Sequence, residues 1–168
     1  IMSVNNPNGE IRGSFRHRSR HSDFDGDGSH DFAVYRPSSG TWYAQNTNGF
    51  NALPFGLVSD KVVSADYDGD GKTDAAVFRN FNGQGIWYIN RSSDGGMTST
   101  FWGLGNDIPL RGDFNGDGRS DVAVYRPSNG VWYILQDNNA VRAEHFGLAE
   151  DIPMPADMDG DGLDDLVV

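Results

Sequence analysis

Four copies of one nine-residue motif, spaced almost evenly, constrain this chain more than any other feature. Each copy reads Asp-x-Asp-Gly-Asp-Gly-x-x-Asp, with Asn in the third place of one copy, and the copies begin 43, 47 and 44 residues apart. They occupy residues 23–31, 66–74, 113–121 and 157–165, which we call loops 1 to 4. A fixed period of this length indicates a repeat architecture, in which each period is one supersecondary unit that packs on its neighbours.

The residues between the loops repeat as well, and they are typical of short strands. In the clearest period the expected strands are rich in Val, Tyr, Trp and Phe, and Gly, Pro, Asn or Asp bounds them. These strands cover 122–125, 131–135, 141–146 and 153–158. Four strands in about 44 residues is the length of a propeller blade. The sequence therefore predicts an all-β fold, a small β-propeller of about four four-stranded blades.

The two ends of the chain fit this prediction in a particular way. In the repeat frame residue 1 falls inside a third strand and residue 168 inside a second strand. We therefore expect residues 1–168 to form a single propeller domain, in which N- and C-terminal strands together complete one blade. Such a blade closes the ring and removes free sheet edges. The alternative is that these ends are arbitrary cuts from a longer array.

The motif itself predicts a calcium site in every loop. Positions 1, 3 and 5 turn side-chain oxygens inward, the Gly at position 6 permits the sharp turn, position 7 offers a backbone carbonyl, and position 9 closes the site. Ca²⁺ accepts about 6 to 8 oxygens in flexible geometry, whereas Mg²⁺ demands stricter octahedral order. The predicted ligands are Asp23, Asp25, Asp27, Ser29, Asp31, Asp66, Asp68, Asp70, Lys72, Asp74, Asp113, Asn115, Asp117, Arg119, Asp121, Asp157, Asp159, Asp161, Leu163 and Asp165.

The motif does not fit an EF-hand. An EF-hand needs Glu at position 12 and a following helix, but position 12 is Val in all four loops and lies in an expected strand. Plain solvated Asp-Gly turns remain the alternative to calcium. Zinc is disfavoured because the chain has no Cys and its four His residues are scattered.

Charge and composition limit the classes of partner that this chain could bind. The net charge is -11, and 21 Asp stand against 3 Glu. This acidity disfavours nucleic acid, and no apolar run approaches the roughly 20 residues needed for membrane insertion. Four calcium ions would change the net charge to about -3. We find no catalytic constellation apart from the repeated carboxylates, so we expect no enzyme activity.

Together these residues resemble the FG-GAP / VCBS repeat family, the blade type of integrin alpha-subunit propellers and many bacterial secreted proteins. The resemblance rests on the four loops, on the Phe-Gly pairs at 55–56 and 146–147, and on the Asp-x-Pro segments at 107–109 and 151–153. It implies a calcium-binding propeller that is secreted or displayed at the cell surface, with roles in adhesion, matrix or recognition. Two departures are Trp102-Gly103 and Arg12-Gly13 in place of Phe-Gly, and about four blades instead of the usual seven.

We therefore predict a non-catalytic extracellular module with a structural or adhesive role, able to form a homo-oligomer or polymer such as a surface layer or filament. The alternatives are a module that recognises a glycan or cell-surface protein, and an accessory domain of a secreted enzyme. Recognition would use the repeated Trp-Tyr pairs and the basic stretch 12–21. The simpler interpretation makes the pairs packing residues and the stretch a local charge balance. Arg36, Arg79 and Arg126 recur with the repeat, and we expect them to bond across blades.

Overall fold

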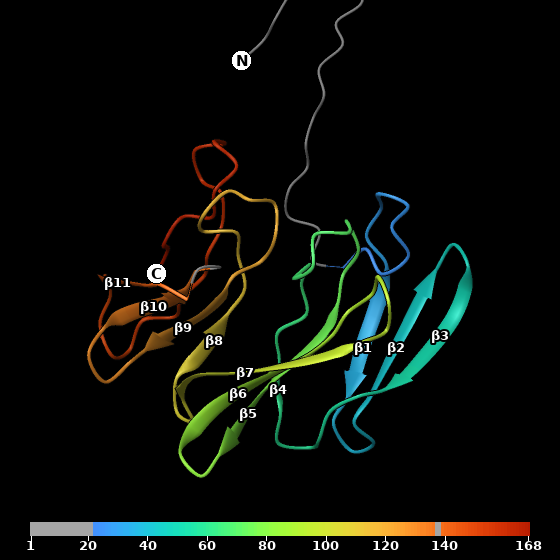
Figure 1. Ribbon diagram of the computed structural model, residues 1–168, viewed down its shortest axis with the longest axis horizontal. Coiled ribbons are helices and arrows are strands. Elements are labelled where there is room, and N and C mark those ends of the chain that lie inside the picture. The colour runs from blue at the N-terminus through green and yellow to red at the C-terminus, as the bar shows by residue number, and fades with distance from the viewer. Residues whose placement is uncertain (1–21, 137–138) are drawn as a thin grey trace, which may run out of the picture.

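The computed structural model describes residues 22–136 and 139–168, and all of their regular structure is β (Figure 1). The strands are β1 (Phe32–Arg36), β2 (Thr41–Asn46), β3 (Gly49–Pro54), β4 (Lys61–Val62), β5 (Ala75–Phe81), β6 (Gln84–Asn90), β7 (Met97–Leu104), β8 (Ile108–Leu110), β9 (Val122–Arg126), β10 (Val131–Leu135) and β11 (Val141–His145). Within these described residues no helix is long and apolar enough to cross a membrane.

The strands form three antiparallel sheets in which every strand pairs with its neighbour in the chain. Sheet 1 has the order β1-β2-β3, sheet 2 the order β4-β5-β6-β7, and sheet 3 the order β8-β9-β10-β11. Loops 2 and 3 connect the first strand of their sheet to the second, so each of these sheets has its own aspartate-rich loop between its first two strands. A four-stranded meander of this kind is the form of a propeller blade.

A fourth unit, residues 152–168, forms the beginning of another sheet around loop 4. The Met154 N–H donates to the Val167 carbonyl at 2.8 Å, and Ala156 bridges Asp165. The strands predicted at 122–125, 131–135 and 141–146 are confirmed as β9, β10 and β11. The strand predicted at 153–158 is wrong in extent, because these residues make only this short pairing.

The core consists of layers between successive sheets. Trp42 of sheet 1 packs with Ala75 and Val77 of β5, and Trp87 of sheet 2 packs with Val124 of β9. In sheet 3, Trp132 belongs to a cluster that Leu166 of the fourth unit covers. Because side chains alternate across a strand, β5 sends residues into two of these layers, and its first four residues are all buried. The Trp of each Trp-Tyr pair is therefore a packing residue, not an exposed platform for sugar.

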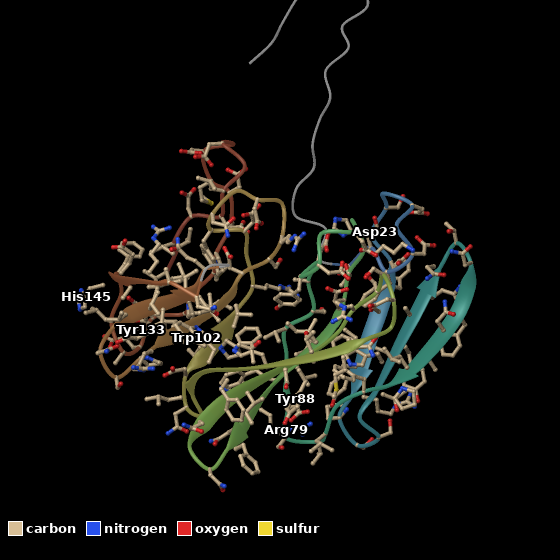
Figure 2. All side chains as sticks on the ribbon, viewed as in Figure 1. Asp23, Arg79, Tyr88, Trp102, Tyr133 and His145 are labelled. Atoms are coloured by element: carbon tan, nitrogen blue, oxygen red, sulfur yellow. The ribbon has the colours of Figure 1, made fainter. Side chains whose placement is uncertain are left out.

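The Tyr of each pair lies on the other face of its strand, beneath the repeated arginine. The guanidinium carbons of Arg79 and Arg126 lie 4.6 and 4.3 Å from the ring centres of Tyr88 and Tyr133, and Figure 2 labels the first of these pairs. Arg126 also forms two hydrogen bonds with Asp107, at 3.0 and 2.9 Å. The prediction that these arginines bond across blades is wrong. Arg79 and Arg126 each pair with an aspartate just before the first strand of their own sheet, and Arg36 hydrogen-bonds Tyr43 of its own sheet.

This ion pair yields a mutational prediction with a matched control. Asp107 is 2% exposed, so replacing Arg126 with Met leaves a buried carboxylate without its counter-charge, and we expect a loss of about 2 kcal/mol in unfolding free energy. The same change at Arg142, whose pair with Glu144 is solvent-exposed, should cost less than about 0.5 kcal/mol. Urea denaturation of both variants checks the difference, and equal losses would contradict it.

The Gly of the Phe-Gly pair has a clear steric reason. Gly147 has a φ of 123°, and a Cβ there would lie 2.7 Å from the Tyr125 hydroxyl oxygen. The neighbouring Phe146 carbonyl accepts the Trp132 indole N–H at 2.7 Å. In sheet 2, where Trp102-Gly103 replaces the pair, the buried Trp87 indole N–H has no hydrogen-bond partner among the described residues. Trp102 instead donates to the Tyr133 carbonyl of the next sheet.

The predicted propeller is thus reproduced in part, as an all-β array of blade-like sheets. Residues 1–21 lie outside the described residues. The N-terminal strands of the predicted mixed blade, the basic stretch 12–21 and the Arg12-Gly13 pair therefore lie outside the described residues.

Candidate metal centres

The four loops gather along one end of the sheets, above the strands in the view of Figure 1. Asp23, labelled in Figure 2, lies at this end. Backbone hydrogen bonds join loop 1 to loop 2, loop 2 to loop 3, and loop 3 to loop 4. Residues more than 40 positions apart in the sequence are therefore neighbours here, and successive aspartate-rich loops lie side by side.

Each loop is shaped by its own aspartates. In loop 1 the Asp23 carboxylate accepts the N–H groups of Gly26 at 2.7 Å and Gly28 at 3.0 Å, while Asp31 accepts the Phe24 N–H. Both glycines have φ near +80 to +90°, which side chains disfavour. The other three loops repeat the two bonds to the first aspartate. The glycines of the motif are thus needed to turn the backbone around the first aspartate.

Three of the loops bring carboxylates close enough to share one ion. One oxygen from each member of a trio lies within 4.8 Å of the others. The trios are Asp23, Asp25 and Asp27; Asp66, Asp68 and Asp70; and Asp157, Asp159 and Asp165. Oxygens that bind Ca²⁺ at 2.3–2.6 Å are at most about 5 Å apart. The spacing and the all-oxygen donor set therefore fit a hard divalent cation.

Without a counter-ion, repulsion between the crowded carboxylates destabilises the folded form of these loops. Burial raises the pKa of Asp66 and of Asp74, since the charged form loses hydration and neighbouring aspartates add repulsion. Burial likewise raises the pKa of Asp31. At Asp25 the Thr47 hydroxyl lowers the pKa by donating a hydrogen bond to the carboxylate. A divalent cation would favour the charged form of all these groups.

Polar residues from the turns between strands also reach the loops, and the motif gave no sign of them. Thr47 and Asn48, between β2 and β3, both donate to the second carboxylate oxygen of Asp25. After β6, Ser92 bonds Asp70 and Asp74, and Ser93 bonds Asp68. The only sequence signal for these contacts was a polar residue at the equivalent position of two periods. Whether its side chain reaches the loop depends on how the hairpin folds over that loop.

The residues at position 7 were predicted as carbonyl ligands, and that role stays a prediction. Their N–H groups donate to the position-5 aspartates, as Ser29 does to Asp27 and Arg119 to Asp117. The side chains of three of these residues, Lys72, Arg119 and Leu163, lie over a glycine of the preceding loop.

Loop 3 differs from the others at its third position. The amide oxygen of Asn115 accepts the Asp117 N–H at 2.9 Å, as an aspartate would. Its Nδ2 donates to Asp121 at 2.9 Å, so the amide partly satisfies the ninth-position carboxylate that a metal would otherwise bind. We therefore predict that loop 3 is the weakest site.

Replacing Asn115 with Asp should strengthen calcium binding at loop 3 by roughly tenfold, because it adds one carboxylate to the site. The reciprocal change, Asp159 to Asn in loop 4, should weaken that site by a similar factor. Isothermal titration calorimetry of both variants measures the changes. An unchanged affinity in both would show that the third position does not bind the ion.

The fold and the loops define an all-β repeat protein whose successive sheets each carry an aspartate-rich loop. The family model for the FG-GAP-like repeat matches residues 23–77 and 113–168, well over half of the chain. The chain therefore belongs to the FG-GAP-like repeat family, and repeats of this family are typical of extracellular or surface proteins. No curated protein and no solved structure matches the chain.

Proposed function

We propose that this protein is a non-catalytic, calcium-binding β-propeller module with a structural or adhesive role outside the cell. The observation that carries the proposal is the set of three carboxylate trios, in equivalent loops at one end of the sheets. Each trio offers oxygen donors only, with the separation that one calcium ion requires. Family membership supports the extracellular setting.

Calcium would act on the fold through the position of the loops. Loops 2 and 3 join the first two strands of a sheet, and loops 1, 2 and 3 each contact the loop that follows, so an ordered loop fixes both its own sheet and its neighbour. The ions would also relieve the repulsion within a chain of net charge -11. Metal binding that is linked to folding in this way stabilises the folded state.

The ring of about four blades belongs to the same proposal. Two sheets have four strands in blade order, and each sheet packs face to face on the next. The fourth unit supplies the inner pairing of a further blade. Strands from residues 1–21 would complete it, and a ring without free edges would suit a subunit of a larger surface assembly.

Isothermal titration calorimetry with calcium tests the proposal directly. We expect uptake of three to four ions per chain and weaker binding of Mg²⁺, which requires stricter geometry. Absence of measurable uptake at about 10 mM calcium, well above the Kd of extracellular sites, would rule the proposal out. Sedimentation velocity with calcium present then distinguishes a single module from an assembling subunit.

A recognition role is the second candidate, and one cleft favours it. A hollow of about 230 Å³ lies between sheets 1 and 2, and its lining includes the amide side chains of Asn46, Asn51 and Asn90 with Ser92. Amides beside an apolar floor suit a polar ligand such as a glycan. Binding on a glycan array that Asn51→Ala abolishes would favour recognition over a purely structural role.

A further inference from the structure

The outermost strand of each sheet has one unpaired edge. In the part of the chain that the structure describes, β3, β7 and β11 each pair with a single strand. The backbone N–H and C=O groups on the other side of such a strand can pair with a strand of another molecule, and natural proteins guard these edges with charge, proline or bulges. Sheet 2 is the clearest case, because all four of its strands are described and it packs between sheets 1 and 3.

The alternation of the β6–β7 ladder identifies the groups that face outward from β7. The Arg91 N–H donates to the Gly96 carbonyl at 2.9 Å, and the register then runs without interruption to Phe101. Hydrogen-bonded and non-hydrogen-bonded pairs alternate along an antiparallel ladder. Met97, Ser99 and Phe101 therefore direct their N–H and C=O groups away from β6. We call these outward groups the β7 edge, and among the described residues no second strand pairs with it.

The two equivalent edges carry protection that the β7 edge lacks. In β3 the Phe55 N–H donates to the Gly40 carbonyl, which places the preceding Pro54 at an outward position, where it offers no N–H. β11 carries Arg142 and Glu144, whose solvent-exposed side chains form an ion pair at 3.3 Å. Proline and charge both discourage pairing at an edge. β7 reads Met-Thr-Ser-Thr-Phe-Trp-Gly-Leu and has neither.

The side chains of β7 also favour strand pairing. Residues 97–102 combine high β propensity with the absence of charge, Pro and Gly. Met97 and Phe101 are 62% and 64% exposed, and they share one face of β7 with Ser99, because side chains alternate along a strand. The register shift of the ladder falls after Phe101, where Trp102 bonds a carbonyl of sheet 3. The β7 edge is thus regular, apolar and open to solvent.

We propose that the β7 edge is a self-association surface, to which β7 of a second copy of this chain adds as an antiparallel strand. Outward residues must oppose outward residues for their hydrogen bonds to form. A two-fold axis at Ser99 meets this condition and places Met97 of each copy opposite Phe101 of the other. The two thioether–ring contacts bury side chains that are exposed in the single chain. Two four-stranded sheets thereby become one sheet of eight strands.

Charge favours a second copy over a partner of different chemistry. The chain has a net charge of -11, so two copies repel each other across much of their surface. The β7 edge brings no like charges together, because it is uncharged and the nearby Arg91 and Asp94 neutralise each other through hydrogen bonds of 3.0 and 2.8 Å. A basic partner would be attracted to the aspartate-rich loops instead. The symmetric order of apolar, small and apolar side chains at 97, 99 and 101 suits a two-fold contact.

The inference rests on the assembling part of the proposed function, to which it assigns a surface, and it places no ion at the contact. One added strand pair is a small interface, so we expect weak dimerisation that is detectable between about 10 µM and 1 mM protein. Sedimentation equilibrium over this range, with calcium present, measures the dissociation constant.

Ser99→Lys is the test variant, and Ala143→Lys is its matched control. Ala143 occupies an outward, exposed position of β11, so both substitutions add one lysine to an outer edge and change the net charge equally. We expect Ser99→Lys to weaken dimerisation by about tenfold or more, since the two-fold axis sets the new charges opposite each other. Ala143→Lys should leave it unchanged. An unmodified protein that stays monomeric at about 1 mM, or equal effects of the two substitutions, would overturn the proposal.

Amide hydrogen exchange read by mass spectrometry locates the contact without any substitution. Raising the concentration of the unmodified protein from about 10 µM to 1 mM should slow exchange in the segment 97–101 and leave the segment 141–145 unchanged. Dimerisation without this protection would place the contact elsewhere and would also overturn the proposal. Calcium uptake is measured separately by calorimetry. Loss of dimerisation with uptake intact therefore counts against the β7 contact alone, and failure of uptake counts against the calcium sites alone.

Discussion

Removal of calcium is expected to lower the melting temperature of this protein by roughly 20 °C. At a calcium concentration 100 times the Kd, each site adds about 2.7 kcal/mol to the unfolding free energy, and the three carboxylate trios together add about 8 kcal/mol. For a domain of this size, each kcal/mol corresponds to about 2–4 °C. Differential scanning calorimetry at about 10 mM calcium, then with excess chelator, measures the shift.

The size of the shift follows from what the loops contain. Without an ion, each trio holds like charges within 4.8 Å, and burial already opposes the charged form of Asp66 and Asp74. Magnesium should restore only part of the lost stability, because its octahedral requirement fits a flexible loop poorly. A melting temperature that does not respond to the chelator would show that the loops are ordinary turns.

A matched pair of variants separates a specific ion effect from general charge neutralisation. Asp70 belongs to the loop 2 trio and Asp94 lies outside the loops, and both residues are exposed. Asp70→Asn should reduce calcium uptake by one site and shrink the chelator effect, whereas Asp94→Asn should change neither. Equal effects from the two substitutions would indicate screening of the net charge and no defined site.

Replacing Trp132 with Ala is expected to destabilise the protein by about 3–5 kcal/mol, the largest effect of any single substitution considered. The side chain is fully buried and packs edge-on against Phe114 and Tyr125, with ring centres 6.4 and 5.7 Å away. Its indole N–H donates to the Phe146 carbonyl at 2.7 Å, so truncation leaves a cavity and an unpaired carbonyl. The melting temperature should fall by roughly 10 °C or more.

Phe101→Ala is the control for this substitution, since Phe101 is also aromatic but is 64% exposed on β7. It should change the unfolding free energy by no more than about 0.5 kcal/mol. Chemical denaturation with calcium held constant checks both values. If Trp132→Ala proved as mild as Phe101→Ala, the layer between sheet 3 and the fourth unit would not be a core.

The local structure of this protein was predictable because its determinants are local. A motif that alternates Asp and Gly can only curl, since its glycines adopt positive φ and its carboxylates accept nearby N–H groups. The strands β9, β10 and β11 were likewise predictable, because β-branched and aromatic residues alternate between Gly and Asn turns. Because the sequence is periodic, each local prediction also applied to the equivalent residues of the next unit.

Several features could not be predicted, because they depend on which residues the fold brings together from distant positions. Arg79 and Arg126 bond aspartates 19 residues away within their own sheets, although the repeat alone suggested contacts across blades. Ser92 and Ser93 reach loop 2 only because the hairpin after β6 folds back over it. The reach of such side chains is set by sheet geometry and not by sequence spacing.

The sequence by itself determined the β class and the four aspartate-rich loops, since short-range turn preferences are properties of a few adjacent residues. Only the tertiary structure decided how the units join. Position-8 amides bind position-1 carbonyls some 50 residues away, and position-7 side chains cover glycines of the preceding loop. These contacts exist because face-to-face packing of successive sheets brings each loop beside the next. The spacing of the repeats along the sequence does not give the distance between the loops in space.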